Sequence, residues 1–454
     1  MALNLSTLTS PATSGDVLAE ALTTADFLEG VPVLRNLARG SQKGGDAKQD
    51  VALNQPKALP LDANGKGYLY LSGVIGNYAS VPDAANLNGI TDFVMEAKDV
   101  YMSDWTTGNA AFFSKYISGN SAFIFRRQST NINIYALYGG VSSNSSFAHG
   151  LTGAATASIR ITRLGTSLTA ELDTGSGYVA IGSTRTVPAA ALDTTTNPLE
   201  IGSSFSGAGD RLLGKMSRAR MWDNATMAGD PVLDVDFTAT NIRHGDTKFK
   251  CGSGQVVTIN QSGNDPATII KKPVLRFDGT NDTLGGLFNQ TLDGGYMFAA
   301  FSVLGDGGIA YGRIFSTNKT TLADTDSSGF IWALRNNLAN NLHYWSQNFF
   351  PPHAGFFDAD RGDYIYELKN TNGSQKSKVN DADLKTSSIS TSLELQEFNI
   401  GAQHQGGARY TSIDLEYLAL FPATITDAQA DSVRNYINNR NNVFSLVDGF
   451  GYYF

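Results

Sequence analysis

The sequence has little of several residue types on which whole classes of function depend. Cys251 is the single cysteine among 454 residues, which excludes an intramolecular disulfide and any metal site built from several cysteines. Charged residues make up only 17% of the chain and the basic ones are scattered, so the clustered phosphate contacts of a nucleic-acid-binding protein are not predicted. No apolar run reaches the roughly 18 residues that a membrane-spanning helix needs.

An export signal and the common catalytic motifs are also missing. Residues 1–10 lack a basic flank followed by an apolar run, so the sequence predicts no secretory signal and indicates folding in a cytoplasm. The 5 histidines show no i, i+4 pair, and neither a Gly-x-Ser-x-Gly elbow nor a phosphate-binding glycine loop occurs. Known motifs therefore point to no class of enzyme.

Glycine is plentiful instead, with 47 residues, and it separates runs of β-branched and aromatic residues. Many short runs with alternating polarity and frequent Gly or Asn turns are typical of an all-β sandwich. The predicted strands are residues 68–71, 92–97, 122–126, 132–135, 157–162 and 167–172 in the first half, and 274–282, 296–301, 330–334 and 364–368 in the second.

Two stretches of the chain repeat one apolar skeleton without a gap. The matching stretches are 199–202 with 398–401, and 215–222 with 413–421. Ile201 corresponds to Ile400, and Trp222 to Phe421. We interpret each copy as a hairpin in which a strand ends in Ile-Gly and a second strand returns. The period is too long for a solenoid repeat and indicates two copies of one domain.

The predicted organisation is therefore an all-β chain with two tandem sandwiches behind a short, partly helical N-terminal segment. The predicted boundaries are 1–60 for an attachment segment, 61–250 for the first sandwich, 251–272 for a linker, and 273–454 for the second sandwich with a helix and an aromatic tail near the C-terminus.

Two helices are predicted outside the strands. An apolar stripe after Ser14 predicts a helix that anchors the chain to a partner, and the alternative is a flexible leader. The residues predicted to make this attachment are Val17, Leu18, Leu22 and Leu28. Near the C-terminus, a capping box and a buried stripe predict a second helix through Thr426, Gln429, Ala430, Val433, Tyr436 and Ile437.

The second copy resembles a known superfamily at two places. The strand Leu275 to Asp282 and the Thr-Asp-Ala-Gln sequence from Thr426 to Gln429 are similar to the concanavalin A-like or laminin-G-like jelly rolls. In the first copy, residues 67–71 and 76–83 resemble modules of tailed-bacteriophage structural proteins. The resemblance implies jelly-roll sandwiches that bind glycans or serve for surface display as often as they catalyse.

Aromatic side chains of the second copy are the predicted ligand-binding or partner-binding residues. They are Tyr344, Trp345, Phe349, Phe350, Phe356 and Phe357. Aromatic faces stack on sugars, and Pro351-Pro352 forbids a continuous central strand there. The alternative is a strand with one buried face, and the sequence leaves both interpretations open.

Four acids are candidates for a calcium site, since laminin-G-like folds often bind calcium at a rim of the sandwich. They are Asp278, Asp282, Asp324 and Asp326. The twelfth position of the loop that begins at Asp324 is Arg335, which excludes an EF-hand. The favoured alternative is that these acids cap turns. Calcium is the one cofactor that the sequence suggests, and no other is predicted.

One strand resembles the catalytic strand of family-16 glycoside hydrolases, which share the jelly roll. The position of their nucleophile is Ser412 here, and only Asp414 and Glu416 remain as carboxylates. A retaining enzyme needs a nucleophile and an acid about 5 Å apart, so we expect no catalysis at this strand.

The predicted function is a non-enzymatic structural protein of a bacteriophage virion, as a tail fibre, receptor-binding component or capsid decoration. We expect synthesis in the host cytoplasm, contacts to other virion proteins and to a host-surface glycan, and a homo-oligomer, with a trimer as one form. The alternatives are a glycan-degrading depolymerase and a free lectin.

Overall fold

The computed structural model describes most of the chain. The described residues are 22–23, 33–34, 47–48, 57–59, 61–62, 65–117, 120–263, 265–272, 274–292, 295–308, 312–318, 330–335, 341–346, 348–349, 364–371, 374–379, 385–387, 395–403, 409–421, 426–428, 430–431, 434–435 and 437. They divide into two compact units, which we call the first sandwich (Leu61–Lys271) and the second sandwich (Met1–Pro60 with Lys272–Phe454). Within these residues no helix is long and apolar enough to cross a bilayer.

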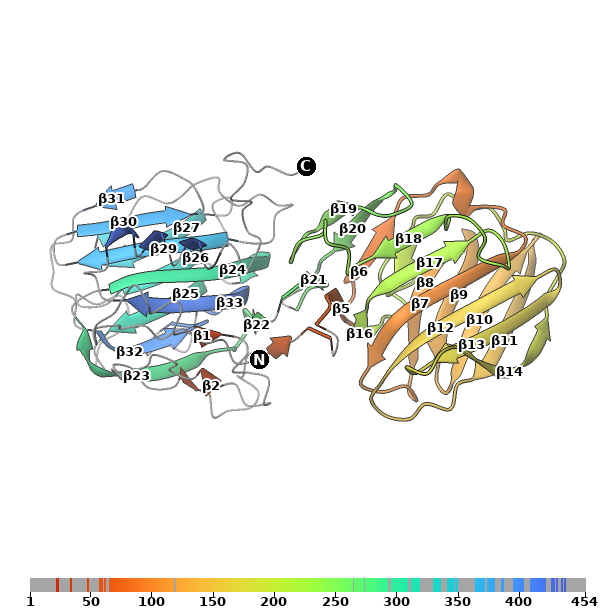
Figure 1. The fold of residues 1–454 in the computed structure, drawn as a ribbon, viewed down its shortest axis with the longest axis horizontal. Helices are drawn as coiled ribbons and strands as arrows, with labels where there is room; N and C mark the ends of the chain where they lie inside the picture. Colours follow the sequence, from red (N-terminus) through yellow and green to blue (C-terminus); the bar gives the residue numbers. More distant parts are fainter. Residues whose placement is uncertain are drawn as a thin grey trace. The chain divides into compact units, whose positions relative to one another are not determined.

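The first sandwich consists of two antiparallel sheets (Figure 1). The β8 sheet has, in spatial order, β11 (Val141–Ala148), β10 (Asn131–Tyr138), β9 (Asn120–Gln128), β8 (Asn109–Ile117), β15 (Leu199–Ile201), β6 (Tyr78–Val81), β20 (Val256–Asn260) and β19 (Lys248–Lys250). The β7 sheet has β14 (Val179–Thr186), β13 (Ser167–Asp173), β12 (Ala155–Leu164), β7 (Phe93–Met102), β16 (Leu213–Met216), β5 (Tyr68–Ser72) and β21 (Thr268–Ile270), while β17 (Arg218–Trp222) pairs with β7 and with β18 (Leu233–Asp236). One 3₁₀ turn, η3, spans Ala85–Leu87.

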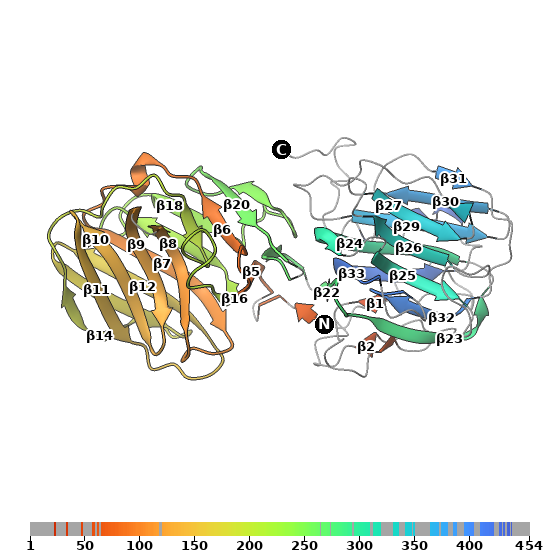
Figure 2. The ribbon, with the colours of Figure 1, turned by 180° about the vertical axis from the view of Figure 1, so that it is seen from behind.

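The second sandwich also consists of two antiparallel sheets (Figure 2). The β24 sheet has β31 (Lys385–Ser387), β30 (Ser374–Val379), β29 (Tyr364–Thr371), β24 (Gly295–Gly308), β33 (Thr411–Phe421), β22 (Val274–Asp278) and β4 (Lys57–Leu59), and β1 (Leu22–Thr23) pairs with β33. The β25 sheet has β28 (Asn348–Phe349), β27 (Asn341–Ser346), β26 (Phe330–Arg335), β25 (Gly312–Asn318), β32 (Leu395–Ile400), β23 (Leu284–Leu292), β3 (Ala47–Lys48) and β2 (Val33–Leu34). The predicted all-β fold of two jelly-roll sandwiches is confirmed.

Alternating polarity builds these layers, as β12 illustrates. Ala157, Ile159 and Ile161 point into the core and are at most 2% exposed, whereas Arg160 between them lies on the outer face. Since side chains alternate along a strand, one polar position for each apolar one gives a sheet with a single buried face. The same pattern supplies the core between the two sheets of the first sandwich.

The repeat predicted from the sequence lies at equivalent places in the two sandwiches, but it is not a hairpin. β15 belongs to the β8 sheet and the next strand, β16, to the β7 sheet, so the chain crosses from one layer to the other. β32 and β33 make the same crossing in the second sandwich. The hairpin interpretation is wrong because two consecutive strands joined by a glycine loop give the same local pattern whether they pair or face each other.

A glycine begins each crossing because no other residue fits. Gly202 has φ +87° and Gly401 has φ +84°, values in the left-handed region. A Cβ atom at Gly202 would overlap the side chain of Leu71, and one at Gly401 would overlap Phe277. Leu71 and Phe277 lie at matching positions of β5 and β22, so the two crossings have the same packing as well as the same backbone.

Two predicted boundaries differ from the structure. Residues 251–272, predicted as a linker, contain β20 and β21, which extend the sheets of the first sandwich beyond β6 and β5. Segment 1–60, predicted as a separate attachment segment, contributes β1 to β4 to the second sandwich. In both cases the backbone groups at open sheet edges pair with the nearest extended segment.

Of the predicted attachment residues, Val17, Leu18 and Leu28 lie outside the described residues. Leu22 lies in β1 and pairs with Leu418, so it belongs to a strand and not to the predicted helix. β22 covers one edge of β33 only from Ser412 to Leu415, and β1 occupies that edge at the next positions along β33. The predicted helix near the C-terminus is present at 427–428, 430–431, 434–435 and 437, with Ala430 and Ile437 buried.

Candidate functional site

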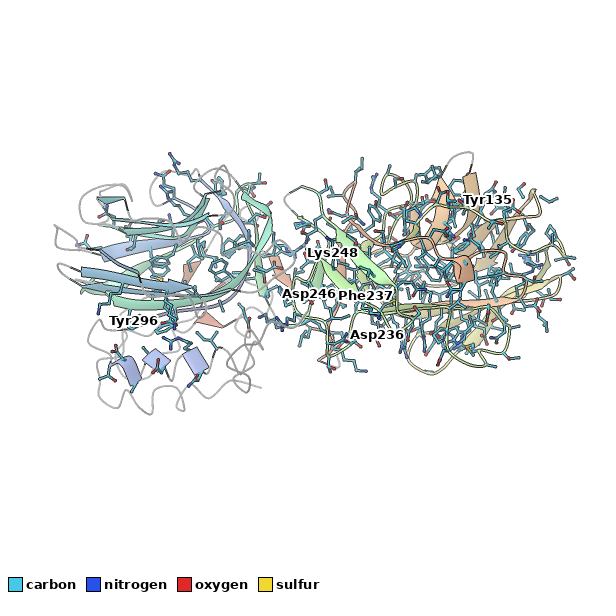
Figure 3. All side chains as sticks on the ribbon, turned by 90° about the horizontal axis from the view of Figure 1, so that it is seen from above. Tyr135, Asp236, Phe237, Asp246, Lys248 and Tyr296 are labelled. Atoms are coloured by element: carbon cyan, nitrogen blue, oxygen red, sulfur yellow. The ribbon has the colours of Figure 1, made fainter. Side chains whose placement is uncertain are left out.

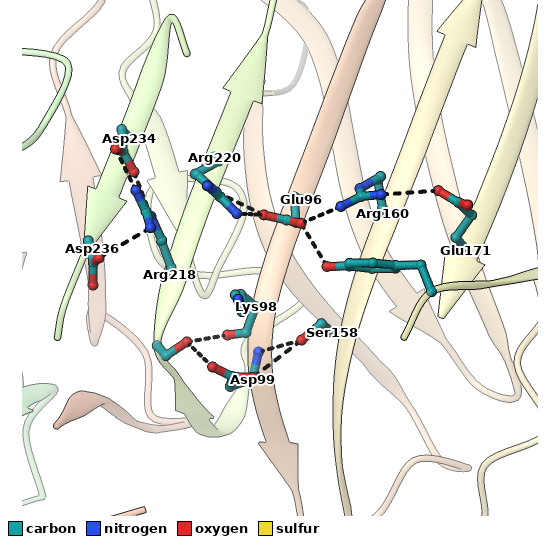
Figure 4. A network of polar contacts seen from close by, with 12 residues as sticks. Glu96, Lys98, Asp99, Ser158, Arg160, Glu171, Arg218, Arg220, Asp234 and Asp236 are labelled. Carbon is teal, nitrogen blue, oxygen red and sulfur yellow. Dashed lines mark hydrogen bonds and ion pairs between the residues drawn. The ribbon is translucent and has the colours of Figure 1, made fainter. Parts of the chain in front are cut away.

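A cluster of charged side chains lies on the outer face of the β7 sheet (Figure 4). Met95 and Ala97 on β7 point into the core, so Glu96 between them points outward. Arg160 on β12 and Arg220 on β17, the strands on either side of β7, lie directly opposite Glu96. Three adjacent strands thereby bring one carboxylate between two guanidinium groups.

Glu96 is only 2% exposed, and two arginines and one tyrosine bind its carboxylate. Arg160 Nη2 donates to Oε1 at 3.0 Å, Tyr178 Oη donates to the same oxygen at 2.7 Å, and Arg220 Nε donates to Oε2 at 2.8 Å. Burial favours the neutral acid, but the hydrogen bond from Tyr178 and the charges of the two arginines outweigh burial and hold the pKa of Glu96 below its usual value. Glu96 therefore stays ionised at neutral pH.

The two arginines that hold Glu96 also lie over aromatic rings. The guanidinium carbon of Arg160 is 3.8 Å from the centre of the Tyr178 ring, and that of Arg220 is 4.9 Å from the Trp222 ring. These cation–π contacts fix the planes of both guanidinium groups. The centre of the face is thus a rigid platform.

Beside this platform a second ion cluster joins β17 to β18. Arg218 donates from Nε and Nη2 to the two carboxylate oxygens of Asp234, each at 2.7 Å, and its Nη1 lies 3.4 Å from Asp236 Oδ2. The hydrogen bonds that Arg218 donates to Asp234, with further support from the charge of Asp236, raise the pKa of Arg218. Asp236 also caps its own turn, since its Oδ1 accepts from the backbone and side chain of Thr238.

A cleft of about 250 Å³ opens next to Arg218. Its lining is polar and apolar in mixture: Arg218, Asp234, Asp236, Ala239, Asn241, Ile242, Lys250, Cys251 and Gly252. The strands β17, β18 and β19 position the four charged groups of this lining, and Asn241 and Lys250 are exposed at its edge. Figure 3 shows Asp236 next to Phe237 at this edge of the first sandwich. The cleft offers carboxylate acceptors, cationic and amide donors, and a small apolar surface to one ligand.

The aromatic residues predicted as a binding site lie in the second sandwich. Tyr344 and Trp345 belong to β27, which pairs with β26, and Phe349 belongs to β28, where it is opposite Trp345. These three residues therefore lie in strands, and both interpretations of their role stay open. Phe350, Phe356 and Phe357 lie outside the described residues.

Two of the acids predicted as calcium ligands lie together in one turn after β22. Asp282 Oδ2 accepts the backbone N–H of Asp278 at 2.8 Å, and Asp278 Oδ1 accepts that of Thr280 at 2.7 Å. Both carboxylates thus cap the turn, as the alternative interpretation predicts. Asp324 and Asp326 lie outside the described residues, and within those residues no group of three or more His, Cys, Asp or Glu is arranged to hold a metal ion.

The carboxylates of the strand similar to the glycosidase motif are both paired with basic residues. Asp414 is fully buried and accepts two hydrogen bonds of 2.8 Å from Arg276. Glu416 is 2% exposed, and its Oε2 lies 2.6 Å from Lys272 Nζ. A cation at this distance stabilises an ionised carboxylate, whereas a general acid needs a carboxyl group that keeps its proton.

The charged cluster and the cleft were not predicted from the sequence. A signal was present, because Arg218 and Arg220 alternate on one strand and Asp234 and Asp236 alternate on another, so each pair lies on one face. The pairing of these two strands could not be seen without the fold, and Glu96 and Arg160 come from strands far away in the sequence.

No family model and no curated protein matches this sequence. Among solved structures, the chain is similar to a putative carbohydrate-binding protein from Bacteroides ovatus, with 14% identity over 45% of this chain and 60% of that chain and a TM-score of 0.34. It is also similar to domains LG4-5 of the mouse laminin α1 chain, with 10% identity, 84% and 93% coverage and a TM-score of 0.31.

A third similar structure is the exoplasmic/lumenal domain of VIP36 in a form with Ca²⁺ and Man3GlcNAc bound, with 10% identity, 35% and 81% coverage and a TM-score of 0.24. The chain spans less than two thirds of the Bacteroides ovatus protein. With TM-scores below 0.5, the fold assignment rests on the strand orders given above.

Proposed function

We propose that this chain is a non-catalytic carbohydrate-binding protein and that the cleft beside Arg218 is its binding site. One observation supports this most: the cleft combines Asp234, Asp236 and Asn241 with two cations and an apolar surface on a face that is otherwise tied into ion pairs. A ligand that both donates and accepts many hydrogen bonds fits such a lining better than an apolar molecule does.

A sugar ring matches this lining group by group. Its hydroxyl groups can donate to the carboxylates and accept from Asn241 and Lys250, which are exposed. Its C–H face can lie against Ala239 and Ile242, which line the same cleft. Since Arg218 already holds both carboxylates, the site is organised before a ligand arrives and loses little side-chain entropy on binding.

The same ion pairs argue for binding and not for hydrolysis. Cleavage of a glycosidic bond needs one carboxyl group that is protonated at the working pH. Arg218 forms ion pairs with Asp234 and Asp236, and Arg276 forms one with Asp414, so each of these carboxylates already has a cationic partner.

A glycan array probed with the full chain tests the proposal. Wild-type protein is expected to bind at least one class of glycan, and Lys250→Ala and Asp236→Asn are expected to weaken that binding tenfold or more. Lys98→Ala and Asp230→Asn are the matched controls, because they make the same charge changes at exposed positions outside the cleft. An array without a binder, or equal binding by the cleft variants, would overturn the proposal. Release of reducing sugar from a bound glycan would favour the depolymerase alternative.

We also propose that the chain displays this site on a bacteriophage virion. The support is the resemblance of residues 67–71 and 76–83 to modules of phage structural proteins, and many copies on one particle would strengthen a weak single site. Mass spectrometry of particles purified from a lysate of the encoding strain tests it: peptides of this chain are expected in the particle fraction and not only in the soluble fraction.

A further inference from the structure

The two sandwiches share one strand order, but four of their strands come from different places in the sequence. In one sandwich these four strands follow the others along the chain, and in the other they precede them. The strands β5 to β17 of the first sandwich match β22 to β33 of the second, and β16 and β17 together match the single strand β33. The remaining strands of the first sandwich, β18 to β21, then occupy the places that β1 to β4 occupy in the second. We call these two four-strand segments the internal donor (Leu233–Ile270) and the N-terminal donor (Leu22–Leu59).

β21 and β4, the last strands of the two donors, pair at equivalent positions of their sandwiches. Ile269 of β21 is opposite Leu69, and Ala58 of β4 is opposite Leu275. Leu69 and Leu275 are equivalent, because they are opposite Met216 and Leu415, which correspond in the sequence repeat.

The remaining donor strands match in the same way. β20 lies beside β6 and β3 beside β23, each on the edge away from β15 or β32. β18 pairs with β17 as β1 pairs with β33. The whole donor is therefore repeated, and not one strand by coincidence.

The sequences of the two donors share two short matches, although the strand registers are offset from these matches by one residue at β4 and by three residues at β1. Asp26-Phe27 in the N-terminal donor corresponds to Asp236-Phe237 in the internal donor, and Asn54-x-Pro56 corresponds to Asn264-x-Pro266 at the same spacing. The order of segments along the chain is therefore N-terminal donor, first sandwich, internal donor and second sandwich.

The donors differ in how they reach their acceptors. The internal donor directly follows the strands that it completes, with β17 ending at Trp222 and β18 beginning at Leu233. All of the first sandwich lies between the N-terminal donor and the second sandwich in the chain. The strands β22, β23 and β33 bind this donor through backbone hydrogen bonds and so do not distinguish it from the same donor of another copy.

We propose that the N-terminal donor of one chain completes the second sandwich of a second copy, so that chains assemble by strand exchange. The exchanged form has the same pairs as the closed form, and concentration and strain in the connections decide between them. The connections are short: β4 ends at Leu59 and β5 begins at Tyr68, while β21 ends at Ile270 and β22 begins at Val274. Short connections of this kind favour exchange.

Disulfide trapping in the full chain distinguishes the two forms. In a Cys251→Ala background, the pair Ala58→Cys and Leu275→Cys joins the N-terminal donor to its acceptor at opposite register positions. The pair Ile269→Cys and Leu69→Cys is the matched control at the equivalent positions of the first sandwich. Both proteins are refolded across a hundredfold range of concentration, oxidised and run on a denaturing gel without reductant.

Strand exchange predicts covalent dimers and larger species for the first pair, increasing with concentration, while the control pair stays monomeric throughout. Analytical ultracentrifugation of the unmodified chain keeps the proposal falsifiable if the cysteine variants fail to fold. It is expected to show oligomers with multiples of the chain mass. An excess of a peptide of residues 14–60 should lower the fraction of these oligomers, and a scrambled peptide should not. A monomer at every concentration, or oligomers with only intramolecular disulfides, would overturn the proposal.

Discussion

The same position on the outer face of the two sandwiches is ionic in one and aromatic in the other. Glu96 is opposite Arg220 in the first sandwich, and at the equivalent place in the second Phe298 is opposite Ala419. Phe298 stacks on Tyr296 with 4.7 Å between ring centres.

The helical segment near the C-terminus explains the aromatic character of the second face. Glu367 occupies the position of Arg160, and Arg434 of this segment donates from Nη2 to Glu367 at 2.7 Å. Figure 3 shows Tyr296 on the side of the β24 sheet where the helical residues lie. The comparison teaches that an outer face of this fold becomes apolar where the helical segment of its own chain covers it, and carries paired charges where no such segment does.

The largest effect is expected from breaking the ionic centre of the first face. Glu96→Ala leaves Arg160 and Arg220 without their shared carboxylate, so the free energy of unfolding of the first sandwich should fall by about 3–5 kcal/mol. Glu171→Ala is the control, because this carboxylate is 33% exposed and lies 3.5 Å from Arg160, and it should cost less than about 1 kcal/mol. Urea unfolding followed by fluorescence measures both, and equal losses would contradict the account.

The feature that the two sandwiches share should respond equally in both. Gly202→Ala and Gly401→Ala each force a side chain into a left-handed, occupied position, so each should destabilise its own sandwich by about 2–4 kcal/mol. Gly229 has φ +74° with open space around its Cβ position, so Gly229→Ala should cost only about 1 kcal/mol. Calorimetry measures the loss of stability in the three variants, and a clearly smaller loss at one crossing glycine than at the other would contradict the equivalence of the two crossings.

Uncovering the second face should have a smaller effect. Arg434→Ala removes the partner of Glu367, which is 3% exposed, and should lower the stability of the second sandwich by about 2 kcal/mol. Asp431→Ala removes only an exposed partner of the same arginine and should change it by less than about 0.5 kcal/mol. Increased binding of a hydrophobic dye by the Arg434 variant alone would show that the aromatic face has opened.

The smallest effect concerns pH. The folded state lowers the pKa of Glu96, so its contribution to stability is present above the unfolded value of about 4.3 and is lost as the pH falls through the lowered folded value. The stability difference between wild type and Glu96→Gln should therefore be constant from pH 7 to about 5 and should narrow only below about pH 4. Denaturant titrations at each pH measure it, and a difference that grows on acidification would contradict the assignment.

Local patterns in the sequence predicted the parts of the fold that depend on them. Alternation at Ile159 and Ile161 identified β12, and the repeat of Ile201-Gly202 at Ile400-Gly401 identified two copies of one domain. The donor strands were missed because strands such as Leu22–Thr23 and Ala47–Lys48 are too short to show a period. The site was missed because Glu96, Arg160 and Arg218 converge only after strands distant in the sequence pair.

Hydrogen–deuterium exchange of the full chain, with and without a bound oligosaccharide from the array, tests the central claim most directly. The account predicts that the ligand slows exchange at residues 234–252 of the first sandwich and leaves the strands of the second unchanged. Protection confined to β26 to β28 of the second sandwich would contradict it.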